Sequence, residues 1–296
     1  MRDRLKSAAW ILIVTMLGSQ LSGCDPAPVE IGKTVYQKSA ATAHCRPGTR
    51  TGKAGISNDE ITPNGVKFNV RTPTNYDPTV QHPLIVVYAP AGRSRFGNEK
   101  MTNLTLAATQ AGFLIAYPDH RRMSGKTLIE MAGIPEQVAG KWCIDENRIY
   151  LTGHSDGGTI AMGLAFLEDT RHIPNAIAAS ASGIRGSDLA AYPCPEPISI
   201  LIMHSKNDGL FPGFGKEAAE WWANCNQCTK DPEPIGADRC VQYPNCAGDV
   251  RTWFCEGTAP HAKWPDINAR ILDFFRTNGA HAPSRLNAAP ELNGAL

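Results

Sequence analysis

Short apolar runs alternate with amphipathic stretches along most of this chain. A short continuous apolar run is typical of a strand buried on both faces, whereas apolar residues three or four positions apart are typical of a helix. Strands are predicted at residues 83–88, 113–119, 148–152, 175–180, 198–204 and 249–255. Helices are predicted at residues 99–111, 128–142, 159–167, 216–223 and 267–276. This alternation predicts a mostly parallel sheet flanked by helices in a single α/β domain.

Several segments depart from this alternation. Asn64-Gly65 precedes the alternating run 66–70, so residues 61–72 are expected to form a hairpin at the sheet edge. Residues 225–248 are rich in cysteine and proline, and we expect them to lack regular elements and to need covalent links. Residues 280–296 are rich in Ala, Pro and Asn, which predicts a disordered tail.

Two local features leave alternatives within the predicted helices. Pro135 lies inside the stretch 128–142, where it must start or interrupt a turn because proline has no N–H to donate. Trp221 and Trp222 either pack in the core or line a cleft, and the core is favoured for such large side chains.

The N-terminus is typical of an exported protein. A basic start over residues 1–6 precedes an apolar run, 8–17, that is too short to span a bilayer comfortably. Leu21-Ser22-Gly23-Cys24 resembles the bacterial lipobox, in which cleavage before the cysteine accompanies its lipidation. We therefore expect a signal peptide over residues 1–23 and a membrane anchor at Cys24. The alternative is an ordinary signal peptide with a coincidental cysteine.

The residues after Cys24 extend this picture. Asp25 resembles the residue that holds enteric-type lipoproteins at the inner membrane. The following stretch has no hydrophobic period, so residues 24–44 are expected to be a tether between the lipid and a domain that starts near Cys45.

Composition and charge narrow the class of protein. The chain has 296 residues, of which 42% are hydrophobic, and this is enough to bury a large core. Its formal net charge is +1, and the sequence shows no basic stripe. A nucleic-acid partner is therefore not expected.

The cysteine count agrees with export. Removing Cys24 from the nine cysteines leaves an even number, which in an exported chain predicts four disulfides. Cys225 and Cys228 also have the spacing of a zinc knuckle or redox pair, but no histidine spacing completes a metal site, so a metal is not expected. The eight remaining cysteines are Cys45, Cys143, Cys194, Cys225, Cys228, Cys240, Cys246 and Cys255.

The segment 153–158, Gly-His-Ser-Asp-Gly-Gly, matches the nucleophile elbow G-x-S-x-G. It follows a predicted strand and opens a predicted helix, and this is the context that the elbow requires. There the serine occupies a strained turn, and the flanking glycines avoid clashes with the neighbouring strand and helix. Ser155 is therefore the candidate nucleophile. The alternative is an ordinary serine in a glycine-rich turn.

A serine hydroxyl near neutral pH is a poor nucleophile, so Ser155 needs a histidine base. In chains with this elbow the order is serine, acid, histidine. His172 follows the elbow helix too soon, and His281 lies in the tail expected to be disordered. His204 precedes the only well-placed acid. His261, in the loop 258–265 between the last strand and the last helix, is the predicted base.

The predicted acid is Asp208. It lies in the turn 205–209 after a buried strand, whose carboxyl end should open on the same sheet edge as Ser155. Asp188, Asp231 and Asp238 lie in irregular segments, where they are expected to face solvent. The alternative for Asp208 is a purely turn-forming aspartate.

An oxyanion formed at Ser155 needs two backbone N–H donors. One is expected from Asp156, whose side chain should point to solvent or cap the helix. The other is expected from Ala91 or Gly92, in the loop after the first buried strand.

With these residues assigned, residues 45–275 resemble the secreted esterases grouped with polyhydroxybutyrate depolymerases and feruloyl esterases. The elbow is common to all α/β-hydrolases. The segment 228–248 leading into His261-x-x-Trp264-Pro265 is the more specific part. The resemblance also covers residues 73–78, Cys143-Ile144-Asp145 before the elbow strand, and the acid loop with Asp208 and Pro212. It implies an α/β-hydrolase fold and a Ser155–Asp208–His261 triad.

The resemblance also suggests a disulfide pairing. It points to a Cys228–Cys246 bridge, and Cys45–Cys143 is our expectation for a second. A hairpin turn near Ala247 would bring Cys240 and Cys255 opposite each other, and Cys194 with Cys225 would complete the set. Two departures stand out. Ala89-Pro90 replaces the usual His-Gly pair before the oxyanion loop, and Pro260 stiffens the approach to the histidine.

The resemblance implies an exported serine esterase that needs no cofactor. Its substrate is expected to be an aryl or short acyl ester, such as feruloyl groups on plant polysaccharide or a hydroxyalkanoate polyester. The catalytic domain is expected over residues 45–279. Two alternatives remain: a peptidase of the same fold, and a non-catalytic lipoprotein whose cleft binds glycans or protein partners.

Overall fold

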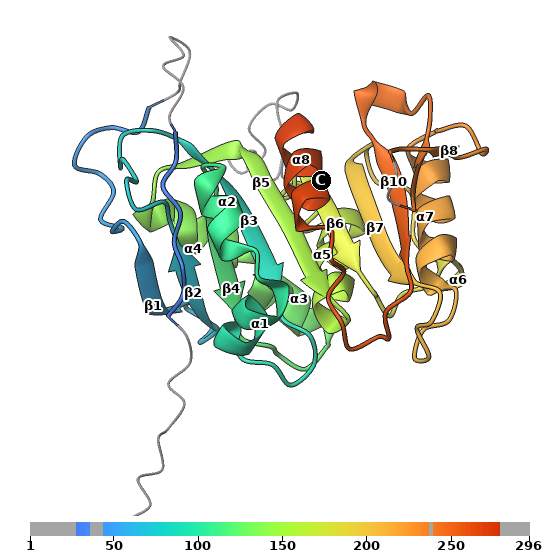
Figure 1. Cartoon of the computed structure of the whole chain (residues 1–296), viewed down its shortest axis with the longest axis horizontal. Coiled ribbons are helices and arrows are strands. Elements are labelled where there is room, and N and C mark those ends of the chain that lie inside the picture. Colours follow the sequence, from blue (N-terminus) through green and yellow to red (C-terminus); the bar gives the residue numbers. More distant parts are fainter. Residues whose placement is uncertain (1–27, 36–43, 237–238, 279–296) are drawn as a thin grey trace, which may run out of the picture.

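The computed structural model describes residues 28–35, 44–236 and 239–278. A single sheet of ten strands crosses this part of the chain, in the order β1-β2-β4-β3-β5-β6-β7-β10-β9-β8 (Figure 1). The strands are β1 Ile56–Ile61, β2 Lys67–Arg71, β3 His82–Tyr88, β4 Leu114–Pro118, β5 Ile144–His154, β6 Ala176–Ser180, β7 Ser199–Ser205, β8 Glu233–Pro234, β9 Cys240–Tyr243 and β10 Thr252–Gly257.

The centre of the sheet is parallel and its edges are antiparallel. Neighbours from β4 through β3, β5, β6 and β7 to β10 pair in parallel. The antiparallel pairs β1–β2 and β2–β4 form one edge, and β10–β9 and β9–β8 form the other. The predicted mostly parallel sheet is confirmed, and the carboxyl ends of its central strands meet at one edge where loops can converge.

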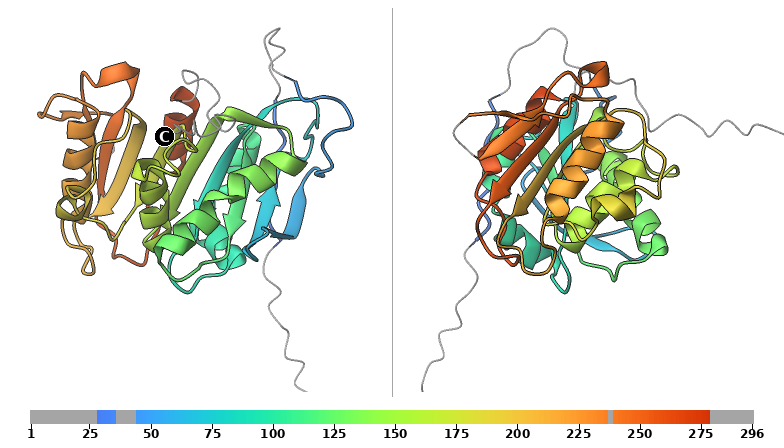
Figure 2. Two further views of the ribbon diagram at one scale, coloured as in Figure 1. Left: turned by 180° about the vertical axis from the view of Figure 1, so that it is seen from behind. Right: turned by 90° about the vertical axis from the view of Figure 1, so that its right-hand side faces the viewer.

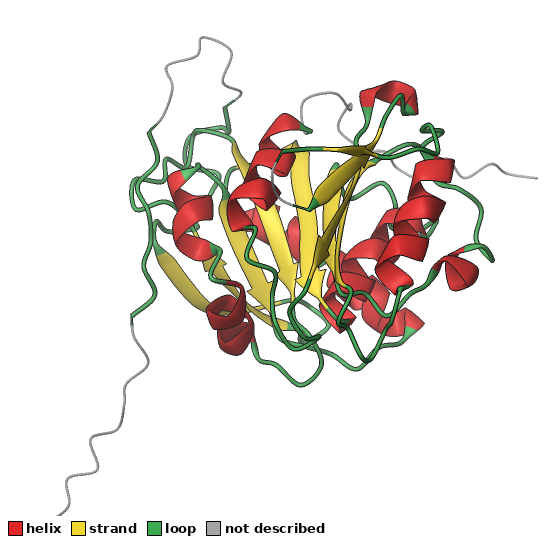
Figure 3. Cartoon of the chain, turned by 45° about the vertical axis from the view of Figure 1, so that its right-hand side comes forward, coloured by secondary structure: helices red, strands yellow, loops and turns green. Residues whose placement is uncertain are grey.

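Helices cover both faces of the sheet (Figures 2 and 3). One core cluster includes Val86 and Leu151 under the larger helical layer, and the other includes Ile85 and Phe274 under the smaller layer. The smaller layer contains α1 Arg95–Thr102, α2 Thr105–Gln110 and α8 Asn268–Thr277. The larger layer contains α3 Gly125–Ala132, α4 Ile134–Lys141, α5 Asp156–Phe166, α6 Gly186–Leu189 and α7 Phe214–Cys225.

The buried strands follow the predicted runs closely. The side chains of β3 are buried along its whole length, as are those of β4 and β6, because both faces of these strands are covered. The predicted edge hairpin is also present, with Gly65 at φ 76° between β1 and β2. Trp222 is fully buried in the core, whereas Trp221 is partly buried against it.

Two predicted helices are each divided in two. The stretch 99–111 is broken at Asn103, which adopts the left-handed conformation at φ 48° and ends α1. The stretch 128–142 is broken at Gly133, and Pro135 lies in the first turn of α4, where its missing N–H costs nothing. In both places the backbone conformation ends a helix although the spacing of apolar residues continues.

Residues 28–35 differ from the expected free tether, because they are hydrogen-bonded to the domain beside α2 (Figure 1). The N–H of Gly32 donates to Thr109 Oγ1 at 2.8 Å, and that of Thr34 donates to Asn75 Oδ1 at 2.9 Å. A Cβ on Gly32 would lie 2.3 Å from Gln110 Cγ, so the close approach depends on glycine. The expected signal peptide, Cys24 and the tail 280–296 lie outside the described residues.

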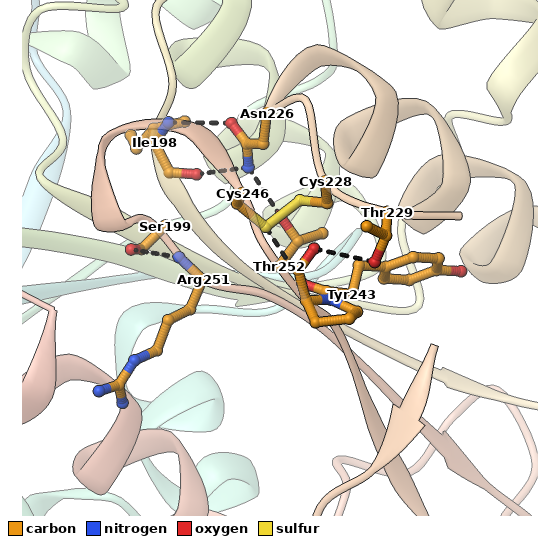
Figure 4. Close-up of a disulfide and its surroundings, with 10 residues drawn as sticks. Ile198, Ser199, Asn226, Cys228, Thr229, Tyr243, Cys246, Arg251 and Thr252 are labelled. Atoms are coloured by element: carbon orange, nitrogen blue, oxygen red, sulfur yellow. Dashed lines mark hydrogen bonds between the residues drawn. A yellow bond between two sulfur atoms is a disulfide. The ribbon is translucent and has the colours of Figure 1, made fainter. Parts of the chain in front are cut away.

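The expectation that residues 225–248 lack regular elements is wrong in part, because they contain β8, β9 and the 3-10 helix η1 Ala247–Asp249. Antiparallel pairing with β10 supplies the backbone partners that the segment alone lacks. The side chain of Asn226 joins the segment to the sheet through Ile198 and Thr252 (Figure 4).

Four disulfides are present among the described residues, and they join the pairs expected from the sequence. Cys228–Cys246 closes the excursion beside Thr252 (Figure 4), and Cys240–Cys255 links β9 to β10. The others are Cys45–Cys143 and Cys194–Cys225. Three of the four therefore lie in the C-terminal half of the chain.

Candidate active site

Ser155 lies in a sharp turn between β5 and α5. Its φ of 55° and ψ of −119° are unfavourable for a residue with a side chain, and its N–H donates to the carbonyl of Ser180 at 2.9 Å. A Cβ on Gly157 would lie 2.0 Å from the carbonyl oxygen of Tyr88, and one on Gly158 would lie 2.4 Å from that of Ser180. Close backbone packing thus explains the glycines of the elbow.

A line of hydrogen bonds runs from Ser155 through His261 to Asp208. Ser155 Oγ lies 3.0 Å from His261 Nε2, and His261 Nδ1 lies 2.7 Å from Asp208 Oδ2. The three residues come from the turn after β5, the loop between β10 and α8, and the loop between β7 and α7. The parallel order β5-β6-β7-β10 brings these loops to one edge of the sheet.

The tautomer of His261 follows from this arrangement. A carboxylate only accepts hydrogen bonds, so Nδ1 carries the proton and donates to Asp208. Nε2 is then free to accept the proton of the Ser155 hydroxyl. This is the arrangement in which a histidine can act as a general base towards a serine.

Asp208 is held as an anion in a buried position, with 2% of its surface exposed. Burial alone would raise the pKa of its carboxyl group, but the hydrogen bond from His261 and the N–H groups of Phe211 and Leu210 outweigh burial and lower the pKa. The carboxylate therefore stays charged near neutral pH, where it can orient His261 and stabilise its cation.

The other histidines and acids considered from the sequence do not join this line. His204 Nε2 lies 3.5 Å from Asp208 Oδ2, but the hydrogen bond that it donates goes to the carbonyl of Phe211 at 2.8 Å. His172 lines a separate hollow together with Ala165 of α5 and Ile198. Asp188 accepts from the N–H of Arg185, and Asp231 is exposed. His281 and Asp238 lie outside the described residues.

The expected oxyanion donors lie on two adjoining segments. Asp156 begins α5, and Ala91 and Gly92 lie in an exposed turn closed by a hydrogen bond from the N–H of Arg93 to the carbonyl of Pro90. β3 and β5 are neighbours, with Tyr88 opposite Gly153. The turn after β3 therefore begins beside the elbow.

The side chain of Asp156 behaves differently from the expectation. It accepts a hydrogen bond at 2.9 Å from Nε2 of His120, a residue in the loop after β4, instead of only facing solvent or capping α5. His120 was missed in the sequence because it lies outside every motif. The contact depends on the pairing of β4 beside β3, which brings the two loops together.

His154 is a second residue that sequence reasoning missed. It occupies the variable position before Ser155, and its ring is buried with 3% exposed. Its Nδ1 lies 2.9 Å from Ser180 Oγ, and its Nε2 lies 2.6 Å from the backbone carbonyl oxygen of His261. The only signal in the sequence was a histidine just after the apolar run that predicts the strand.

A cavity of about 490 Å³ opens beside His154 and under the His261 loop. Its apolar lining includes Met203, Trp264 and Ile267, and charged Arg239, Glu256, Lys263 and Asp266 also border it. Ser155 is not among the lining residues, so this cavity lies behind the histidine and not over the serine.

Comparison with known proteins supports the same fold. No established family model matches the chain. Feruloyl esterase D of Neurospora crassa is 23% identical over 236 residues, which cover 71% of this chain and 78% of the relative. This similarity agrees with the expected resemblance to feruloyl esterases.

Solved structures of esterases and related hydrolases share the architecture. Acetyl xylan esterase from Aspergillus awamori has a TM-score of 0.57 at 17% identity and covers 76% of this chain and 99% of its own. S-formylglutathione hydrolase from Staphylococcus aureus has a TM-score of 0.53 at 12% identity and covers 74% of this chain and 97% of its own. The chain therefore has the α/β-hydrolase fold, and it is similar in sequence to a feruloyl esterase and in fold to an acetyl xylan esterase.

Proposed function

We propose that this chain is an exported serine esterase with Ser155 as nucleophile, His261 as general base and Asp208 as the acid that orients it. The observation that carries the proposal is the line of hydrogen bonds at 3.0 Å and 2.7 Å that ends on a serine in a nucleophile elbow. A serine in an ordinary glycine-rich turn would have no reason to face a histidine that is itself bonded to a buried carboxylate.

The reaction proceeds in two halves. Ser155 Oγ attacks the ester carbonyl carbon while its proton passes to His261 Nε2, and the resulting tetrahedral oxyanion collapses. The alkoxide leaves with the proton from His261, and an acyl-serine remains. A water molecule then gives a proton to His261 and attacks the acyl group, and the second collapse releases the carboxylic acid and returns the proton to Ser155.

The charges that develop in this sequence have partners in the chain. The carboxylate of Asp208 stabilises the cation on His261. The oxyanion would accept hydrogen bonds from the N–H of Asp156 and from that of Ala91 or Gly92. Helix α5 starts at the elbow, so its amino end also favours negative charge there.

The similar proteins support a broad class of ester substrate. We propose an aryl or short acyl ester, with polysaccharide-linked feruloyl or acetyl groups first and hydroxyalkanoate polyester second. The sequence similarity to a feruloyl esterase supports the first of these.

We also propose that the protein is exported and anchored through a lipid on Cys24. Four disulfides support export, because they persist in oxidising compartments. No helix among the described residues is long and apolar enough to cross a bilayer. The mass of the mature protein decides the question: a diacylglycerol-modified Cys24 supports an anchor, and an unmodified N-terminus contradicts it.

The test of activity uses purified protein and p-nitrophenyl acetate or butyrate. We expect hydrolysis in the wild type and its loss in Ser155→Ala with thermal unfolding unchanged. An unchanged rate of hydrolysis in Ser155→Ala would contradict the proposal. A panel of methyl ferulate, p-nitrophenyl esters, a polyester film and peptide amides then ranks the substrate classes and separates an esterase from a peptidase.

Labelling by a fluorophosphonate gives an independent readout, because it reports an activated serine without the correct substrate. We expect labelling at Ser155 and none in Ser155→Ala. A wild type that neither hydrolyses any ester nor reacts with the probe would instead favour a non-catalytic binding protein.

A further inference from the structure

The residue before the nucleophile joins the elbow to the loop that carries the base. His154 ends β5, and its buried ring bonds on one side to Ser180 and on the other to the backbone of His261. A carbonyl oxygen only accepts, so His154 Nε2 carries the proton and donates to it. In the neutral ring Nδ1 then has a free lone pair, and it accepts from the hydroxyl of Ser180.

We propose that His154 is a positioning residue that fixes the backbone of His261 against the elbow, so that the base meets Ser155 at hydrogen-bond distance. This inference rests on the proposed function, because its effect is on the base of that reaction. Asp208 fixes the rotation of the His261 ring, and His154 fixes the backbone that carries the ring.

The loop needs such support because its start is exposed and a cavity lies beneath it. Thr258, Ala259 and Pro260 are exposed, and the cavity of about 490 Å³ lies under the same stretch. Two hydrogen bonds hold the start of the loop before His261: the side-chain Nδ2 of Asn207 donates to the carbonyl of Thr258, and the N–H of Lys206 donates to the carbonyl of Gly257. The ring of Phe211 packs edge-on against the His261 ring, with centroids 5.1 Å apart, but the hydrogen bond from His154 acts on the backbone of His261 itself.

The ring of His154 also adjoins the base directly. Its centroid lies 5.4 Å from that of His261 and 6.2 Å from that of Trp264. Burial lowers the pKa of His154 to about 4, so its ring stays neutral near pH 7 and does not oppose the cation that forms on His261. The charged or titratable groups that face it are His261, Asp208 and His204.

Loss of this one hydrogen bond is expected to lower the catalytic rate strongly. A reacting group displaced by about 1 Å loses on the order of 100-fold in rate. The ring of His154 is buried, with 3% exposed, and acts on the base and not on the substrate, so the loss should fall on kcat and leave KM nearly unchanged.

The test compares His154→Leu with His154→Gln on a p-nitrophenyl ester. Leucine fills the space but donates nothing, and we expect kcat to fall about 100-fold with KM within about threefold. Glutamine places an amide N–H near the position of Nε2, and we expect it to restore kcat to within about tenfold of the wild type. Equal impairment of the two variants, or a wild-type kcat in His154→Leu, would overturn the proposal.

Two controls separate positioning from general destabilisation. His82 is another buried histidine, with 2% exposed and Nδ1 bonded to the carbonyl of Gly112 at the far end of the sheet. We expect His82→Leu to lower thermal stability while the folded protein keeps its kcat. Ser180→Ala removes only the partner of His154 Nδ1, and a loss of about threefold to tenfold in kcat is expected even if His154→Leu does not fold.

A crystal structure of each variant distinguishes failure of this inference from failure of the proposed function. In His154→Leu we expect His261 Nε2 beyond hydrogen-bond distance of Ser155 Oγ, whereas in His154→Gln we expect it to remain near 3.0 Å. An unmoved His261 in the leucine variant contradicts the role of His154, whether or not the wild type hydrolyses esters.

Discussion

The nucleophile and the base are held by different means. Ser155 lies in a turn that backbone atoms enclose on several sides, so that even one Cβ on Gly157 or Gly158 would clash. His261 lies in an exposed loop above a cavity and is fixed by polar contacts to Asp208 and His154. Backbone packing holds the nucleophile, whereas the base is held mainly by hydrogen bonds, with one ring contact from Phe211.

The contrast matters because the two kinds of support fail differently. Backbone packing is insensitive to pH and tolerates almost no added volume. A hydrogen-bonded loop accepts changes in volume but depends on the protonation state and chemistry of each partner. Substitutions at the elbow should therefore act on the whole domain, whereas substitutions around His261 should change the rate of a folded enzyme.

The largest effect is expected at the elbow. The Cβ of Gly157→Ala would lie 2.0 Å from the carbonyl oxygen of Tyr88, in the backbone of a central strand that has no room to move. We expect a loss of at least about 3 kcal/mol of unfolding free energy and no fluorophosphonate labelling. Urea unfolding and labelling measure the two effects.

Gly140→Ala is the matched control, because no atom lies within 4 Å of the added Cβ in α4. It should stabilise the domain by about 0.5–1 kcal/mol and leave the activity unchanged. If Gly157→Ala behaved like Gly140→Ala, the elbow would not be defined by packing.

The second effect concerns the acid beside the base. Asp208→Asn keeps the shape of the side chain but offers an amide N–H where Nδ1 of His261 needs an acceptor, which favours the wrong tautomer. We expect kcat to fall on the order of 10⁴-fold with the fold retained, as measured on a p-nitrophenyl ester and by circular dichroism. Asp188→Asn, on the exposed side of α6, should keep the wild-type rate. A modest loss in Asp208→Asn would mean that another group orients His261.

The smallest effect is the acid sensitivity of His154. Burial lowers its pKa from 6.5 to about 4 in the folded state. Between these values the unfolded chain binds a proton that the folded chain does not, so the unfolding free energy falls as the pH falls from about 6.5 to about 4. This one residue should contribute up to about 3 kcal/mol to the decrease.

His154→Gln removes the part of the pH-dependent decrease that is due to His154. Burial also lowers the pKa of His82, but the decrease due to His82 is the same in the variant and in the wild type. Urea unfolding at pH 7 and pH 4.5 should show a smaller decrease in the variant than in the wild type. Parallel decreases would mean that His154 does not titrate during unfolding in this range.

Much of the fold could be predicted because buried parallel strands leave a clear apolar signature. The runs around Val86 and Ile115 became β3 and β4 as expected. The divided helices could not be predicted, because the left-handed backbone of Asn103 is a local choice that an apolar period does not record. The contacts of residues 28–35 with α2 likewise depend on tertiary packing around Gly32.

Part of the candidate site could also be predicted from the sequence. Chain order and strand ends indicated Ser155, Asp208 and His261, and these three side chains meet in the structure. His154 and His120 were not indicated, because each acts on a residue distant in sequence through a contact that exists only after the loops converge. A motif names the residues of a reaction more readily than it names the residues that hold them.

The backbone of Ser155 has a consequence beyond the reaction itself. A residue with a side chain at φ 55° and ψ −119° stores on the order of 1–3 kcal/mol that glycine would release. Selection for stability alone would replace this serine with glycine and give a more stable protein without catalytic activity. Catalytic activity and stability therefore favour different residues at position 155, and the serine present there favours activity.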